Sequence, residues 1–474
     1  MLRDDGHETD NNDDISHDDN SDIVTMATTT STTASSSSSW IRTGSSMLLS
    51  PIPTLPLLVL LILLSSTRHD CVAAAATWNH AKLGVLFLPP AARMKLGMDE
   101  RLKQECRDRS PSDGVSFVWE STVTEGYEVA TSIFQCLVKS DTAHPNTMVW
   151  FPRFDNEVML KALTTVLNDN SERLGLGAVR YSCWPATPAT VVTLSTQSVS
   201  ADSQVNAQND CSNESSTSTT ATDGAAITAT KDWVDNTLGR LGLCPHTVSM
   251  TKAAVGLENV GVKRGPVVIR TCQDATTTES SLSKTTGLRT IPTDAARLSA
   301  AFWKCLSEMA TTPEQDLATV LLLAPSAYDH DFLRFAAVCD KLIEPTVQAT
   351  GVTSLIGRAW FHPLYDTAAV GHSSILAGHA LPASMVQGFV RDQQQGKDSN
   401  GPKPQDIAIA NDAVRWSPHA TINLLRRSQL DAAKEAEAQA TNRKPNAIYA
   451  NNVLRILADK TLLSERSSTD HKNL

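Results

Sequence analysis

An internal repeat constrains the fold of this chain more than any other feature. One phrase begins at Trp233, continues after four intervening residues with Leu238-Gly239, and ends at Met250. Residues 78–94 show the same order of residue types, again from a tryptophan to a methionine. A phrase that recurs in this way indicates that one structural unit occurs twice.

Later segments strengthen this interpretation. Residues 133–137 read IFQCL and correspond to FWKCL at 302–306, while TMVWFP at 147–152 corresponds to VLLLAP at 320–325. We therefore interpret the chain as a tandem duplication. The alternative is chance similarity between two α/β segments.

Both copies alternate β-favouring apolar segments with segments of helical periodicity. Strands are predicted at 115–119, 147–151 and 178–184 in the first copy, and at 267–269, 319–323 and 355–361 in the second. The helices between them are predicted at 129–138, 157–167, 295–309 and 331–343. Helical crossovers imply parallel pairing. The predicted fold class is α/β, with two tandem βαβαβ-type repeats, the first degenerate, and extra C-terminal helices on the second.

Three further segments follow in the second copy. Residues 366–412 are rich in Gly, Ala, Ser and Gln and are predicted to form a long loop. Ser417-Pro418 has the residue types of a helix start, with Ser as N-cap and Pro at the first helical position. We expect that helix to continue through Leu424, and a last amphipathic helix to occupy residues 446–463.

The chain begins with an acidic, Asn-rich and Ser/Thr-rich segment, residues 1–46, that is predicted to be disordered. Residues 47–66 contain a short apolar run, and small residues follow at 73–76. This pattern favours a cleaved secretory signal within residues 47–76, with translation starting at Met26 or Met47. Two alternatives stay open. The segment is an uncleaved signal anchor, or the start of the protein is assigned wrongly and the segment is neither a signal nor an anchor. The predicted destination is the secretory route or an organelle reached through it, such as a plastid.

The remaining domain boundaries are predicted from changes in amino-acid composition. The first copy spans 77–194, a Ser/Thr-rich linker 195–231, the second copy 232–464 and a short tail 465–474. The linker carries a glycosylation sequon at Asn213, which matters only on the secretory route. Eight cysteines follow the predicted signal, and we expect mostly free thiols because a chain of this size needs no disulfides.

Charge and composition limit the partners. The net charge is -10, partly from the acidic start, so the chain shows no electrostatic footprint for nucleic acid. No polybasic stretch suits an anionic membrane surface, so membrane contact is expected only through residues 47–66 if they stay uncleaved. No cofactor is indicated, and the oligomeric state stays open.

A resemblance to a known family rests on an ordered set of short segments. They are Leu243-Cys244-Pro245, LLLAP at 321–325, Asp331-Phe332, FHPLY at 361–365, SPH at 417–419 running to LLR at 424–426, and IYANN at 448–452. In this order they resemble domain-of-unknown-function family 1415, over about residues 232–464. The resemblance implies candidate positions and no reaction.

The chain also departs from that family. Arg415-Trp416 stands where bacterial members typically have Asn-Arg, and Asn423 stands where they often have His. The segment 366–412 is longer than usual. The first copy matches only in degenerate form. Pro89 occupies the position equivalent to Cys244, and no histidine lies near the position equivalent to His362.

Three residues are candidates for catalysis. Cys244 is either a reactive thiol or a buried small apolar residue. His362 ends a predicted strand, where α/β proteins place ligands, and is either a base or metal ligand, or a hydrogen-bonded histidine that closes the strand. His419 falls in the first turn of the helix predicted from Ser417. A Cys/His nucleophile pair or a metal site is conceivable from these residues, although no specific metal is indicated.

The same helix start suggests an anion site. Free N–H groups at a helix N-terminus bind anions, and Arg426, seven residues after His419, would share its helix face. The expected anion-binding set is Arg358, Ser417, Asn423, Arg426 and Asn452. The acidic cluster at 328–331 is interpreted instead as the N-cap and first turn of the next helix.

Two functional hypotheses follow. The first is an enzyme that acts on a small anionic substrate through a Cys/His/Arg pocket in the second copy, with His362 or His419 as general base and Arg426 holding the anion. The second is a non-catalytic binding or assembly module in which these residues cap and pack. Only the first requires the side chains to converge.

Overall fold

The structure is a computed structural model. It describes residues 100, 101, 104, 115–139, 146–184, 189–196, 219–244, 246–273, 293–370, 381–394, 401–439, 447–459 and 463. The predictions for the acidic start, the signal or anchor, the first tryptophan phrase, the sequon and the final tail lie outside these residues. Within the described ranges, no helix is both long and apolar enough to cross a membrane.

The first repeat forms a four-stranded sheet. Its strands are β1 (Val115–Trp119), β2 (Asn146–Phe151), β3 (Leu176–Trp184) and β4 (Ala189–Thr196), in the spatial order β1-β2-β4-β3. β1 and β2 are parallel, and β4 is antiparallel to both of its neighbours. The connections are α4 (Gly126–Lys139) between β1 and β2, and α5 (Glu157–Asp169) with α6 (Ser171–Leu174) between β2 and β3.

The second repeat forms a sheet of the same topology. Its strands are β7 (Val267–Thr271), β8 (Thr319–Leu323), β9 (Ile356–Phe361) and β10 (Thr421–Arg426), in the order β7-β8-β10-β9. β7 and β8 are parallel, and β10 is antiparallel to β8 and β9. Between them lie α9 (Asp294–Thr311), then α10 (Phe332–Val338), the π-helix η4 (Cys339–Ile343) and α11 (Glu344–Thr350). The predicted α/β fold of two tandem repeats is confirmed.

The strand registers match the alignment predicted from the sequence. Val149 and Phe151 of β2 enter the main apolar core, as do their expected counterparts Leu322 and Ala324 beside β8. Met148 and Leu321, which directly precede Val149 and Leu322, lie on the opposite face of each sheet. The two repeats therefore share the same inward-facing alternation.

The helix predicted from Ser417 is wrong. Residues 421–426 form strand β10, and helix α15 begins only at Arg427 (Arg427–Gln439). Ile422 and Leu424 supply core side chains at strand spacing, and the backbone of β10 pairs with β8 on one side and β9 on the other. The expectation of parallel pairing throughout is also wrong, because each sheet places an antiparallel strand between its second and third strands.

Two segments predicted to be irregular contain helices. The predicted loop 366–412 includes α12 (Thr367–Val370), α13 (Ala383–Gln394) and most of α14 (Pro404–Ala413). The end of the predicted linker forms α8 (Thr219–Trp233), followed by the π-helix η1 (Val234–Gly239). Small residues such as Ala226 and Thr230 of α8 are fully or almost fully buried, so this helix is held by tertiary packing and not by an apolar sequence stripe.

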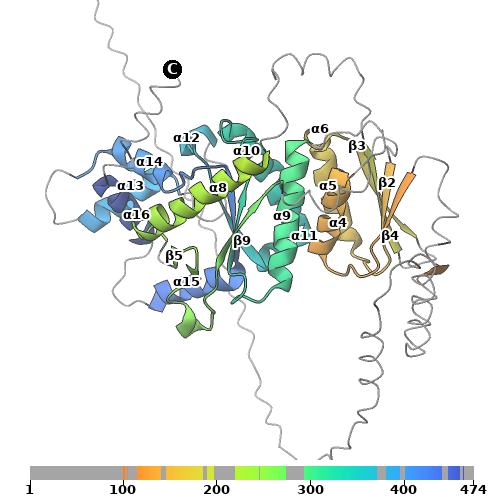
Figure 1. Ribbon diagram of the computed structural model, residues 1–474, viewed down its shortest axis with the longest axis horizontal. Coiled ribbons are helices and arrows are strands. Elements are labelled where there is room, and N and C mark those ends of the chain that lie inside the picture. The colour runs from red at the N-terminus through yellow and green to blue at the C-terminus, as the bar shows by residue number, and fades with distance from the viewer. Residues whose placement is uncertain are drawn as a thin grey trace, which may run out of the picture. The chain divides into compact units, whose positions relative to one another are not determined.

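The helices of the two repeats pack against each other. α4 contacts α9, and α5 contacts α11, so that a layer of helices from each repeat lies between the sheets (Figure 1). Phe134 stacks on Trp303 with ring centroids 6.4 Å apart, and the Thr131 hydroxyl donates to the Trp303 carbonyl at 3.1 Å. A single apolar core therefore extends through both repeats.

Other helices cover the far side of the second sheet and the C-terminal region. Trp233 packs edge-on against Phe361 with centroids 5.3 Å apart, which places the repeated tryptophan phrase on the outer sheet face. α13, α14 and α16 (Ala447–Ala458) form a separate apolar cluster, visible together in Figure 1. The second repeat thus carries extra C-terminal helices, as predicted, although of these three only α16 matches a predicted helix and α13 and α14 lie largely in the segment predicted as a loop.

Trp303→Ala tests the shared core. Trp303 is fully buried between α4 and α9, so its loss should reduce the free energy of unfolding by about 3–5 kcal/mol. Urea denaturation followed by circular dichroism measures this, with Leu333→Ala, at a position 58% exposed, as the control. Wild-type unfolding should be a single transition, and separate transitions for the two repeats would contradict a shared core.

Candidate functional site

The chain gathers polar residues at one edge of the second sheet. β8 and β9 end at this edge, and β10 begins there because it runs antiparallel to both. Residues 325–329 follow β8, His362 follows β9, and His419 lies just before β10. The carboxyl end of parallel strands is the usual place for ligands in α/β sheets.

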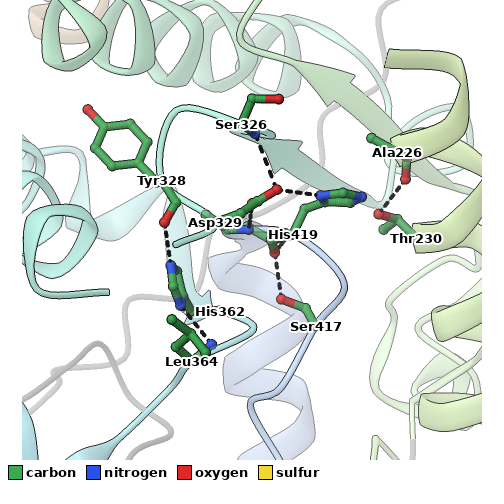
Figure 2. Close-up of polar contacts among 11 residues, drawn as sticks. Ala226, Thr230, Ser326, Tyr328, Asp329, His362, Leu364, Ser417 and His419 are labelled. Atoms are coloured by element: carbon green, nitrogen blue, oxygen red, sulfur yellow. Dashed lines mark hydrogen bonds and ion pairs between the residues drawn. The ribbon is translucent and has the colours of Figure 1, made fainter. Parts of the chain in front are cut away.

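Asp329 and His419 form a hydrogen-bonded pair at this edge. Nδ1 of His419 lies 2.7 Å from Oδ2 of Asp329 (Figure 2). Oδ1 of Asp329 accepts the N–H of Ala420 at 2.8 Å. The N–H of Ser326 also donates to Oδ2, at 3.2 Å. Burial tends to raise the pKa of Asp329, but these hydrogen bonds, first that from His419, outweigh burial and hold the pKa below its ordinary value.

A tight turn positions Asp329. Ser326 has a φ of 64°, and the N–H of Ala327 donates to the Pro325 carbonyl at 2.7 Å, which closes a γ-turn around Ser326. A left-handed conformation is unfavourable for a residue with a side chain. The bond from Ser326 N–H to the Asp329 carboxylate helps to hold the turn. Strained backbone of this kind is concentrated at functional sites.

The pair leaves one imidazole nitrogen available. Because a carboxylate can only accept, Nδ1 of His419 carries the proton and Nε2 carries a lone pair in the neutral ring. In the described part of the chain, no hydrogen-bond partner lies at Nε2, and the side chain is 21% exposed. Asp329 thus fixes the orientation and tautomer of an imidazole whose other nitrogen can receive a proton.

Both imidazole nitrogens of His362 are hydrogen-bonded to the backbone. Its Nδ1 accepts the N–H of Leu364 at 2.9 Å, and its Nε2 lies 2.8 Å from the Tyr328 carbonyl (Figure 2). The imidazole is fully buried, and burial lowers its pKa. No lone pair remains for a substrate or a metal. The geometry corresponds to the structural alternative, a histidine that closes its strand.

Cys244 is not part of this arrangement. It follows η1, and Leu243 beside it packs in the apolar cluster of α13, α14 and α16. The Leu243 carbonyl accepts the side-chain N–H of Asn452 at 2.7 Å. Among the described residues, the side-chain hydrogen bonds of His362 and His419 go to Tyr328, Leu364 and Asp329 and not to this thiol. The structure does not form the Cys/His nucleophile pair.

The predicted anion-binding residues do not converge either. Arg426 ends β10 opposite Ile356, at the other edge of the sheet from His419, and donates to the carbonyls of Thr312 and Leu317 at 2.6 and 2.8 Å. Arg358 pairs with Glu344 of α11, with Nε 2.6 Å from the carboxylate. An anion site at a helix N-terminus near His419 is wrong, because no helix begins at Ser417.

The remaining members of that set have other roles or positions. The Ser417 hydroxyl donates to the His419 carbonyl at 2.6 Å, which shapes the approach to β10. Asn423 lies within β10, paired with Leu321 and Ala359. No group of three or more potential metal-ligating side chains occurs among the described residues. Cys136, Cys244, Cys272, Cys305 and Cys339 are free thiols, as expected for those positions.

Sequence reasoning missed the role of Asp329. The cluster at 328–331 was assigned to a helix start, and this is correct for Asp331, whose carboxylate accepts the N–H of Arg334 at 2.9 Å. Asp329 instead turns toward His419, 90 positions later in the chain. An acidic residue soon after a buried strand was the available signal.

The first repeat lacks the equivalent pair. Val191 pairs with Trp150 as Thr421 pairs with Leu323, so Ala189 holds the position of His419. Cys183, which pairs with Thr190, holds the position of His362. The equivalences follow from the matching strand registers. Any chemistry of the Asp–His pair therefore belongs to the second repeat alone.

Comparisons with protein-family models, curated proteins and solved structures give no match. The resemblance to domain-of-unknown-function family 1415 stays a prediction.

The two histidines should show opposite neutral tautomers. His362 should carry its proton on Nε2 and His419 on Nδ1, because of their respective partners. Long-range nitrogen–proton NMR correlations at neutral pH distinguish the tautomers, with His362→Gln and His419→Gln variants to assign the signals. An Nε2–H tautomer at His419 would contradict the described Asp329 contact.

Buried His362 should make stability depend on pH. Its pKa in the folded chain lies below the ordinary value of about 6.5, so the unfolded chain binds the additional proton first. Stability from this group is complete above about pH 6.5 and should fall as pH drops toward the folded pKa, by at most about 1.4 kcal/mol per pH unit. Urea titrations of wild type and His362→Gln between pH 8 and 5 measure the slopes. Equal slopes would refute this assignment.

Proposed function

We propose that the second repeat is the catalytic part of an enzyme that uses His419 as a general base on a small anionic substrate. The observation that carries this proposal is the 2.7 Å contact between Asp329 and Nδ1 of His419, with no protein partner at Nε2 in the described part of the chain. A base of this type needs a fixed tautomer, a free nitrogen and contact with solvent or substrate; Asp329 fixes the tautomer, and the His419 side chain is 21% exposed.

Direct proton transfer is supported better than covalent catalysis. Among the described residues, no serine, threonine or cysteine is hydrogen-bonded to the His419 imidazole, which donates only to Asp329. The base would therefore take a proton from a bound water or from the substrate itself. We place hydrolysis by an activated water first, because it needs no further protein nucleophile.

The role of Asp329 in this proposal is to orient the imidazole and to stabilise the imidazolium formed when the proton is taken. The low pKa of its carboxyl keeps the group ionised at neutral pH, as this role requires. Asp329→Asn would keep the shape of the side chain but place an amide that can donate against Nδ1. The imidazole would then favour the other tautomer, with the proton on Nε2.

The alternative is the non-catalytic module. It is favoured by the other bonds of Asp329, which tie the turn at Ser326 to the backbone of Ala420 and so join β8 to β10. In that case the pair acts as a structural clamp. The two functions differ in whether His419 affects turnover at unchanged stability.

Hydrolysis assays with the full chain test the proposal. We would measure release of 4-nitrophenol from the anionic 4-nitrophenyl phosphate, with the neutral 4-nitrophenyl acetate for comparison, by wild type, His419→Ala and Asp329→Asn. Loss of the base should lower kcat/KM by roughly 100-fold to 10,000-fold. His330→Ala, at an exposed histidine beside Asp329, is the matched control and should keep wild-type activity.

Thermal denaturation of the same variants separates the alternatives. If His419→Ala folds with nearly wild-type stability and has lost activity, the catalytic proposal stands. If wild type turns over neither compound and both substitutions lower only the melting temperature, the clamp function is supported and general-base hydrolysis is not.

A further inference from the structure

Arg415 is the most deeply buried arginine side chain near the sheet edge that the proposed mechanism does not use. It lies between α14 and β10 and is only 3% exposed. Its carbonyl accepts the N–H of His362 at 3.0 Å, and its own N–H donates to the Asp412 carbonyl at 2.8 Å. The backbone of Arg415 is therefore fixed beside the residue that closes β9.

One nitrogen of the Arg415 guanidinium is buried without an acceptor. Its Nη1 is buried without a hydrogen-bond partner, and no carboxylate of the described residues forms an ion pair with this side chain. Its Cζ lies 5.5 Å from the ring centroid of Tyr365, and Asp412 and Tyr449 act on the guanidinium electrostatically without hydrogen bonding to Nη1. A buried guanidinium stays charged, so a nitrogen of it that lacks an acceptor is destabilising.

The hydroxyl of the neighbouring Tyr365 side chain also lacks a hydrogen-bond acceptor. Tyr365 is 1% exposed, and its hydroxyl is buried without a hydrogen bond. Thr367 lies near this hydroxyl, but the two groups do not reach hydrogen-bond geometry. Thr367 instead donates to the Asp412 carboxylate through its hydroxyl and its N–H. Two buried donors on contacting side chains thus lack acceptors.

One oxyanion would satisfy both donors. Carboxylate and phosphate oxygens match the planar fork of a guanidinium and accept from a phenol hydroxyl. We propose that Arg415 and Tyr365 form a buried anion site that binds a single carboxylate or phosphate group of a small molecule. This proposal corrects the sequence-based anion site, which relied on Arg358 and Arg426.

The position also suggests a relation to the Asp329–His419 pair. His362 donates its N–H to the Arg415 carbonyl, and its imidazole contacts the carbonyl of Tyr328, the residue before Asp329. This site rests on the proposed function only if it holds the anionic group of the substrate of that enzyme. Anion binding itself requires no activity of His419, so the two proposals can fail separately.

Thermal shift measurements on the full chain test the site. Wild type would be freed of anions by extensive dialysis and titrated with inorganic phosphate or with acetate, against sodium chloride at matched ionic strength. We expect saturable stabilisation by at least one of the two oxyanions, and the stronger one identifies the class of group. Native mass spectrometry of undialysed protein should show a co-purified small molecule at one copy per chain.

Substitutions assign the effect to the site. Arg415→Met should weaken binding of the responding oxyanion by about tenfold or more, since a charge-assisted contact is lost. Arg391→Met, at an exposed arginine of α13, is the matched control and should bind as wild type does. If Arg415→Met fails to fold, Tyr365→Phe, which removes one donor while keeping the ring, should still weaken binding measurably.

The outcomes are decisive for this site. Equal stabilisation by the oxyanions and by chloride, with Arg415→Met at least as stable as wild type, would overturn it and show that the guanidinium is satisfied within the chain. His419→Ala should keep the full response to the oxyanion. An oxyanion response that survives in His419→Ala but not in Arg415→Met supports the site, whatever the hydrolysis assays show.

Discussion

The position of strand β10 between β8 and β9 determines most of what is distinctive in the second repeat. β10 pairs along its whole length with β9 and over residues 421–425 with β8, and it runs antiparallel to both. Its first residues therefore lie at the edge where β8 and β9 end. Without this strand, His419 would not reach Asp329, and Arg415 would not lie against His362 and Tyr365.

The first repeat shows that the framework does not require this chemistry. β4 occupies the same central position as β10 and contributes Val192 and Leu194 to the core, as β10 contributes Ile422 and Leu424. Yet Ala189 stands at the position of His419. Since the same topology forms without the pair, the fold alone does not account for Asp329 and His419.

The first repeat has a clear physical role as a packing partner. Its helices α4 and α5 cover the helices of the second repeat, and the fully buried Phe134 and Trp303 meet at this interface. Burying large aromatic side chains is among the strongest contributions to stability. α9 and α11 therefore have a partner on each side, the second sheet and the first repeat. The arrangement stabilises the sheet whose edge carries the proposed sites.

Local sequence patterns were sufficient to predict the duplication and the elements with strong local preferences, but not β4 or β10. Helical periodicity and short apolar runs located α4, α5, α9 and the strands β1, β2, β7, β8 and β9 closely, because these segments have strong local preferences. The alignment of 147–152 with 320–325 agreed with the strand registers. The capping role of Asp331 was likewise readable, since it acts within one turn of its own helix.

Tertiary structure decided the identity of β10 and everything that follows from it. Residues 421–425 have a pattern compatible with either state, and Ser417-Pro418 locally favours a helix; pairing with β8, about a hundred positions earlier, made the segment a strand. The same holds for the sites. Asp329 meets His419 across 90 positions, and Arg415 contacts Tyr365 across the intervening helices. Local sequence patterns do not predict such long-range contacts, because the contacts depend on which strands pair in the folded chain.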